Sequence, residues 1–129
     1  MIRKLALVCL FAIFCASAHS AEADAGKTKF AAECSSCHSV RAGDSGGMGP
    51  NLSNIIGRQA ATSDSGYSYS LPLRNSKIVW DAATLNWFLA DPYIAVPGTA
   101  MQMSVPDQAG RDDLIAYLVS LAATPVSRP

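Results

Sequence analysis

The chain has 129 residues, a length that predicts a single domain. Ten Lys and Arg residues balance ten Asp and Glu residues, so the formal net charge is zero with both histidines neutral. This balance argues against binding to nucleic acid or another polyanion, which requires a strongly basic surface.

The N-terminal segment has the pattern of a secretory signal peptide. A short basic stretch, Met1 to Lys4, precedes an apolar run from Leu5 to Cys15, and small residues follow at Ala16 to Ala18. This order is typical of a signal that is cleaved after export. The apolar run is too short to span a bilayer comfortably, so we expect no stable membrane insertion. We therefore predict that residues 1–20 are removed and that residues 21–129 form one domain in the periplasm.

Cys34, Cys37 and His38 form the most informative motif of the chain. They end a helix that we predict over Asp24 to Cys37 from its apolar residues at helical spacing. Two cysteines three residues apart and a histidine four residues after the first lie on one face of a helical turn. This pattern is typical of c-type haem attachment, in which the thiols form thioether bonds and the imidazole binds the iron.

A Cys-x-x-Cys pair also occurs in zinc sites and in thioredoxin-like redox proteins. Zinc would need two further ligands, and no cysteine or histidine follows His38 in the sequence. A thioredoxin-like site would follow a strand, whereas the surroundings of this pair are helical and turn-like. Haem attachment is therefore the interpretation that we favour.

A glycine-rich loop from Arg41 to Asn51 follows the motif and contains Gly49 and Pro50. Proline lacks an N–H group but keeps its carbonyl, so Pro50 can offer a fixed acceptor to the outer nitrogen of His38. Such a bond would set the tautomer of the imidazole. Without a further indication, the Gly-Pro pair is equally consistent with an ordinary turn.

The polar segment from Ala61 to Ser70 shows little periodicity, and a loop of this length in a small domain needs something to enclose. Arg58, Tyr67, Tyr69 and Trp80 supply hydrogen-bond donors suited to two carboxylates of a bound group. Taken only as residue types, they fit surface charge and core aromatics at least as well.

Two more helices are expected in the second half of the chain. Trp80 to Ala90 has an apolar face and is followed by Asp-Pro, which marks a helix end. Arg111 to Ala123 has apolar residues at the i, i+3, i+4 and i+7 positions. We expect this last helix to cross the first one at Gly26, because a helix tolerates glycine best where another backbone packs closely.

The segment between these helices contains the candidate for a second iron ligand. Pro97 and Gly98 predict a tight turn that directs a following side chain inward. Methionine thioether is a soft ligand that raises the reduction potential of a haem. We favour Met101 as this ligand, with Met103 as the alternative.

Taken together, these motifs resemble class I cytochrome c. The resemblance runs from Gly26 to Leu118 and rests on separate motifs in one order: Gly26-x-x-x-Phe30, Cys34-Ser35-Ser36-Cys37-His38, Gly49-Pro50-Asn51-Leu52, Gly57-Arg58, Tyr67-Ser68-Tyr69-Ser70, Trp80, Pro97-Gly98-Thr99-Ala100-Met101 and Arg111 to Leu118. It implies an all-α cytochrome c fold, with three to five short helices around one covalently bound haem c and crossed N- and C-terminal helices.

The resemblance also implies roles for single residues. It favours Met101 over Met103 as the axial ligand opposite His38. It implies hydrogen bonds to the haem propionates from Tyr69 and Trp80, and a nearby electrostatic role for Arg58.

Three features depart from the family pattern. Phe88 stands where a tyrosine near the methionine ligand is common, and Leu73 stands where an asparagine is typical. Glu33, Tyr93 and Ala100 replace lysines that surround the haem edge in mitochondrial members. An acidic docking patch is therefore a poor match for the partner of this chain.

By this resemblance we expect a soluble one-electron carrier rather than an enzyme. We expect its partners to be redox proteins: a periplasmic dehydrogenase or membrane complex as the electron donor, and a terminal acceptor. The carrier itself would be a monomer that forms transient complexes with them. Two alternatives remain: a cytochrome subunit held permanently on a dehydrogenase, and a haem peroxidase or small-ligand sensor with an open sixth position on the iron.

Overall fold

The computed structural model describes the backbone of residues 5–45, 47–62 and 66–123 and, within these ranges, the side-chain environments of residues 18–122. Most of the predicted signal segment, residues 1–20, lies outside the described side chains, so its removal stays a prediction. Within the described ranges no helix combines the length and the apolar character needed to cross a membrane.

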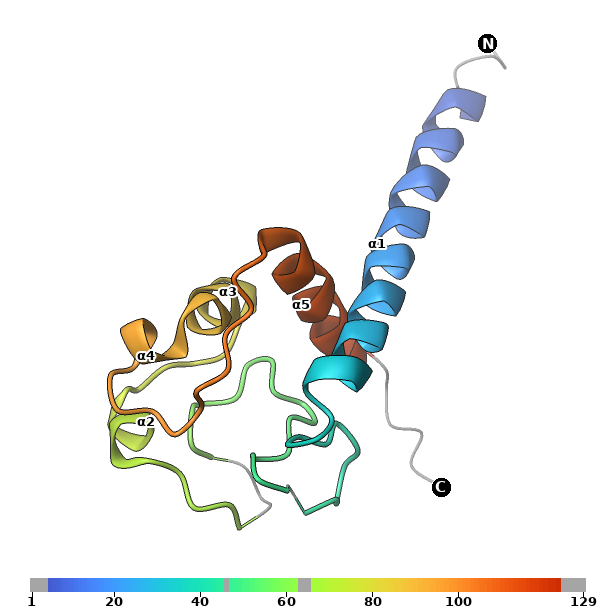
Figure 1. The fold of residues 1–129 in the computed structure, drawn as a ribbon. Helices are drawn as coiled ribbons and strands as arrows, with labels where there is room; N and C mark the ends of the chain where they lie inside the picture. The colour runs from blue at the N-terminus through green and yellow to red at the C-terminus, as the bar shows by residue number, and fades with distance from the viewer. Residues whose placement is uncertain (1–4, 46, 63–65, 124–129) are drawn as a thin grey trace.

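The described part of the chain is helical, and it contains no strand beyond an isolated bridge between Gln59 and Val79. The helices are α1 (Leu5–Glu33), α2 (Leu71–Asn75), α3 (Ala82–Ala90), α4 (Pro92–Ala95) and α5 (Gln108–Ala123). Figure 1 shows α5 lying across the C-terminal part of α1, with α2, α3 and α4 gathered on one side and the loops between α1 and α2 below them. The all-α prediction is confirmed.

The first helix differs from its prediction at both ends. It begins at Leu5, well before Asp24, and it stops at Glu33. The Cys-x-x-Cys-His motif follows as a hydrogen-bonded turn, in which the N–H groups of Cys37 and His38 donate to the carbonyl oxygen of Cys34 at 3.0 and 2.9 Å. The motif therefore keeps the compact spacing of a helical turn without belonging to the helix.

The crossing of α1 and α5 is centred on Gly26, as predicted. A Cβ atom on this residue would overlap the backbone carbonyl of Asp113 and lie 2.8 Å from Cβ of Tyr117. The ring of Tyr117 packs against Phe30 with centroids 5.7 Å apart, and Leu114 is fully buried beside them. The absence of a side chain at Gly26 is what lets the two helices approach this closely.

Aspartates set the starts of α3 and α4. The side chain of Asp81 accepts a hydrogen bond from the N–H of Thr84, and the hydroxyl of Thr84 accepts one from the N–H of Asp81. This reciprocal cap starts α3 at Ala82, two residues after the predicted start. Asp91 ends α3 as predicted and also caps α4, which the sequence did not indicate.

The buried apolar side chains come from α3 and α5, from Phe30 on α1, from Ala95 on α4 and from the loops. The three that α3 contributes are Leu85, Phe88 and Leu89. They form one cluster with Phe30 and Leu114. Because all five also line the cavity described next, this part of the hydrophobic core forms part of the wall of that cavity.

Candidate functional site

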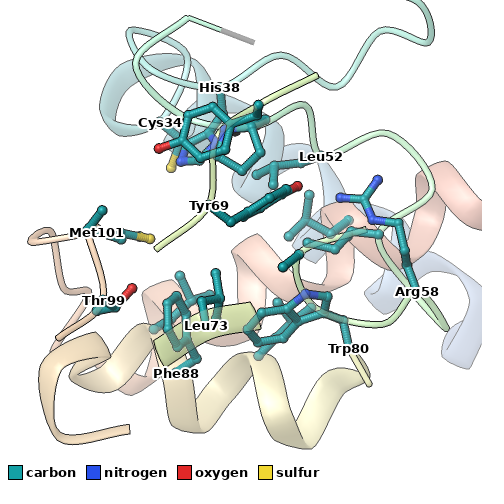
Figure 2. Close-up of a pocket in the computed structure, with 18 of the residues that line it drawn as sticks. Cys34, His38, Leu52, Arg58, Tyr69, Leu73, Trp80, Phe88, Thr99 and Met101 are labelled. Atoms are coloured by element: carbon teal, nitrogen blue, oxygen red, sulfur yellow. Dashed lines mark hydrogen bonds between the residues drawn. The ribbon is translucent and has the colours of Figure 1, made fainter. Parts of the chain in front are cut away.

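A mostly apolar cavity that is partly open to solvent lies within the described part of the chain. A concave, mostly apolar space lined by a few polar groups is typical of small-molecule and cofactor sites. Figure 2 shows His38 and Cys34 on one side, Phe88 on the opposite side, Met101 and Thr99 at one end, and Arg58 and Trp80 at the other. Residues far apart in the sequence therefore converge on one space.

His38 is held by the loop that follows it. Its Nδ1 atom lies 2.8 Å from the carbonyl oxygen of Pro50, so the predicted contact is present. When Nδ1 carries the proton and donates to Pro50, Nε2 keeps its lone pair and can bind a metal. Gly49 packs against the ring so closely that a Cβ atom there would lie 2.5–2.9 Å from three ring atoms. The ring is therefore fixed by a hydrogen bond and by steric contact.

The two cysteines differ in their position. Cys34 lines the cavity, whereas Cys37 is half-buried and is not among the lining residues. Neither forms a disulfide. Burial raises the pKa of the Cys34 thiol above its ordinary value, and the nearby carboxylate of Glu33 raises it further. Cys34 is thus a half-buried thiol in the wall of an apolar cavity.

Arg58 stabilises the loop beneath His38. Its two terminal nitrogens donate to the carbonyl oxygens of Ser53 and Asn51, both at 2.9 Å. Asn51 is buried, and its amide donates to the carbonyl oxygens of Arg41 and Asp44 at 2.7 and 3.0 Å. The resemblance implies that Arg58 lies near the bound group. Arg58 does line the cavity, but both of its terminal nitrogens bind backbone carbonyl oxygens.

Polar groups collect at the end of the cavity near Arg58. Tyr69 and Trp80, whose donor groups we expect to bind carboxylates, line the cavity. Ser70 lines it too, and its Oγ atom is buried with no hydrogen-bond partner among the residues that the structure describes. A buried hydroxyl without a partner is costly, which points to an acceptor on a bound group. In the sequence analysis Ser70 stood only within a motif and was not singled out.

Met101 lines the other end of the cavity, and Figure 2 shows its sulfur directed into this space. Met103, the alternative, is exposed and does not line the cavity. The turn predicted before Met101 is present: the N–H of Thr99 donates to the carbonyl oxygen of Val96 at 2.9 Å, and Gly98 has a φ of +86°. A left-handed residue at this position explains the glycine.

Arg111 anchors the segment that follows Met101, and its role was missed because it looked like an exposed first residue of a helix. The side chain is buried, and one terminal nitrogen donates to the carbonyl oxygens of Val105 and Pro106, both at 2.7 Å. Its Nε donates to the side-chain oxygen of Asn86 on α3 at 2.8 Å. The guanidinium therefore joins the Met101 segment to α3.

The two apolar departures from the family pattern lie on the same side of the cavity. Leu73 and Phe88 both line it, together with Leu85 and Leu89. The wall around Met101 is accordingly apolar apart from Thr99. Water has few polar groups to bind in this region, in contrast to the end near Arg58.

Comparisons with known proteins show which family the chain resembles. The family model described as Cytochrome c matches residues 23–122. Cytochrome c from Guizotia abyssinica is 38% identical over 111 residues, which cover 84% of this chain and 97% of that protein. Cytochrome c2 from Rhodoblastus acidophilus is 37% identical over 101 residues, 78% of this chain and 92% of that protein. The solved structure of cytochrome cH from Methylobacterium extorquens is similar with a TM-score of 0.69 and 39% identity, covering 76% of this chain and 97% of that one.

Proposed function

The chain belongs to the cytochrome c family, and from this premise we propose that it is a periplasmic one-electron carrier whose haem iron is bound by His38 and Met101. Members of this family carry one covalently bound haem c and act as electron carriers. The predicted family, fold and cofactor are therefore confirmed. The two ligands, the compartment and the partners are the content of the proposal.

The residues of the cavity fit a large, flat, mostly apolar group with carboxylates at one edge. Its walls are mostly apolar, and its polar lining includes Tyr69, Trp80 and the unpartnered hydroxyl of Ser70. When bound, haem c supplies an iron that gains and loses one electron. We assign thioether attachment to Cys34 and Cys37, and hydrogen bonding of the carboxylates to the donors at the polar end.

One observation carries the ligand assignment. His38, oriented by Pro50, and Met101, held by the turn before it, project from separate segments into the same cavity. An imidazole and a thioether bound together would leave the iron no position for a substrate. A closed site of this kind suits electron transfer and does not suit peroxidase chemistry or small-ligand sensing. The soft thioether also favours the reduced state.

Pro50 and Arg58 act indirectly in this proposal. The carbonyl oxygen of Pro50 holds the His38 tautomer that leaves Nε2 free to bind metal. Arg58 keeps the Asn51 segment in place through its two bonds to backbone carbonyls, and its positive charge adds a favourable field at the polar end of the cavity. Both residues are positioning groups rather than ligands.

The ferric absorption spectrum of the purified holo-protein tests this function. We expect a weak far-red band from sulfur bound to ferric iron, together with slow binding of cyanide. Absence of the band with fast binding of cyanide or carbon monoxide would instead assign the protein to the peroxidases or sensors. Isolation only as a stable complex with a dehydrogenase would assign it to the permanent subunits of such complexes.

Identification of the N-terminal residue of the protein purified from the periplasm tests the predicted removal of residues 1–20.

A further inference from the structure

The segment between Met101 and α5 is tied to the rest of the domain only near its end. Residues 101–107 form neither helix nor strand, and Figure 1 shows this stretch, in orange, passing α3 before the chain enters α5. Within the described part of the chain, the first backbone hydrogen bond after Thr99 joins the N–H of Val105 to the carbonyl oxygen of Leu89 on α3, at 2.7 Å. The place of Met101 therefore depends on how firmly the segment is held against α3.

A second tie to α3 passes through Arg111. One terminal nitrogen of its guanidinium donates to the carbonyl oxygens of Val105 and Pro106. Its Nε donates to Oδ1 of Asn86 on α3 at 2.8 Å, and the other terminal nitrogen donates to Oε1 of Gln108 at 2.6 Å. All four acceptors are neutral oxygens, although the Arg111 side chain is only 7% exposed. A buried cation that is held by neutral oxygens depends on each of them.

Asn86 and Gln108 complete a closed triangle with Arg111. The amide nitrogen of Gln108 donates to Oδ1 of Asn86 at 2.9 Å and to the carboxylate of Asp112 at 2.7 Å. Oδ1 of Asn86 thus accepts two hydrogen bonds, which uses both of its lone pairs. Because a guanidinium can only donate, both amides must turn an oxygen toward Arg111, and this fixes the orientation of each amide.

We propose that Asn86, supported by Gln108, is a positioning residue for the Met101 ligand. Its Oδ1 holds the guanidinium of Arg111 in the orientation that clamps the Met101 segment onto α3, and this clamp sets how readily the thioether leaves the iron. The inference rests on the proposed function, because it takes Met101 as a ligand. It assigns control of that bond to a half-buried amide of α3 that no motif of the sequence indicated.

The rate at which cyanide binds to the ferric holo-protein measures the release of Met101. At saturating cyanide, opening of the sixth position limits this rate. Asn86→Leu removes the acceptor and keeps a similar volume, and we expect the rate to rise roughly tenfold, as for the loss of one hydrogen bond to a charged group. The melting temperature of each variant is measured by circular dichroism. If the triangle only joined α3 to α5, the melting temperature would fall and the cyanide rate would stay unchanged.

Three single variants accompany this measurement. Asn75→Leu is the matched control, because it makes the same change at an exposed residue of α2, and it should leave the rate unchanged. Asn86→Asp keeps the acceptor oxygen and should bind cyanide as slowly as the wild type. Gln108→Met removes the supporting amide from an exposed position and should raise the rate several-fold. This last variant decides the question if Asn86→Leu does not fold.

A double variant tests whether Asn86 acts through Arg111. If it does, adding Asn86→Leu to Arg111→Gln should change the cyanide rate little beyond the effect of Arg111→Gln alone. Two independent effects would instead multiply.

Several results would overturn the proposal. An unchanged rate in Asn86→Leu, or in Gln108→Met where that variant decides, would reduce the triangle to a structural contact. An equal rise in Asn75→Leu, a fast rate in Asn86→Asp, or multiplied effects in the double variant would also contradict it. These results leave the proposed function intact as long as the wild type binds cyanide slowly and shows the far-red band. Fast binding without the band in the wild type would overturn the proposed function together with the role of Asn86.

Discussion

The two sides of the cavity are held in different ways. On the His38 side, hydrogen bonds and steric contact fix each segment: Pro50 orients the ring, Gly49 packs against it, and Asn51 and Arg58 hold the loop below. On the Met101 side, the walls are apolar, and the segment is tied by a turn before the methionine and by Arg111 after it. The first side is held by contacts along its whole length, whereas the second is held mainly at its two ends.

This difference suggests where each ligand is sensitive to change. Any substitution that shifts the residues packed against the His38 ring should displace the imidazole. Met101 should be displaced by substitutions that release an anchor of its segment or that admit water to the apolar wall. This should hold even where the substituted residue lies several positions away. The predictions below test this contrast, beginning with the largest effect.

Gly49→Ala should have the largest effect, because the added methyl group would overlap the His38 ring. Overpacking of this kind costs about 1–3 kcal/mol, and here it also displaces an iron ligand. We expect a large loss of holo-protein, measured as haem per polypeptide after purification. Gly47→Ala is the matched control, since its nearest neighbour would lie at 3.4 Å. Equal yields from the two variants would show that the ring tolerates movement.

Arg111→Gln should release the anchor on the other side. The backbone carbonyls of Val105 and Pro106 would lose their donor inside the protein, at a cost of about 1–3 kcal/mol. We expect a lower melting temperature and loss of the far-red Met101 band at a lower pH than in the wild type. The exposed Arg74→Gln is the control. A lower melting temperature with an unchanged pH for loss of the band would limit Arg111 to a purely structural role.

Leu73→Asn should introduce a polar group into the apolar wall near Met101. Leu73 is half-buried, and an amide that loses water in this wall without gaining a partner costs about 1–3 kcal/mol. Leu71→Asn is the matched control, because Leu71 is exposed on the same short helix. Thermal unfolding of the two variants measures the difference. If Leu73→Asn were as stable as its control, the Met101 side would contain water or an acceptor that the amide can reach.

Asp81 should give the smallest effect and a defined pH dependence. The N–H and hydroxyl of Thr84 lower the pKa of Asp81 below its ordinary value. A lowered pKa means that this cap contributes stability at neutral pH, which is lost as the pH falls through the folded-state value. Asp81→Asn keeps a capping oxygen but does not titrate. We expect its unfolding to show a weaker acid dependence than the wild type, and parallel curves would contradict this.

The sequence predicted best what depends on spacing and on backbone chemistry. Gly26 predicted the crossing of α1 and α5, Pro50 predicted the contact with His38, and the Pro-Gly turn predicted that a following methionine faces inward. In each case one residue type restricts the backbone strongly enough to be read without a structure.

Other features could not be predicted because they depend on tertiary contacts. Helices α2 and α4 have five and four residues, too few to show a periodic pattern. Arg111 resembled a surface residue, since nothing in its own helix indicates the carbonyl groups that it binds. Ser70 and Asn51 stood within recognised motifs, and only their burial distinguishes them from ordinary loop residues.

The most direct test of the His38 and Met101 site compares Met101→Ala with Met103→Ala. The ferric spectrum and the reduction potential are measured for both variants and for the wild type. We predict that Met101→Ala loses the far-red band and has a lower potential, whereas Met103→Ala retains both properties. Loss of the band in Met103→Ala with its retention in Met101→Ala would contradict the ligand assignment.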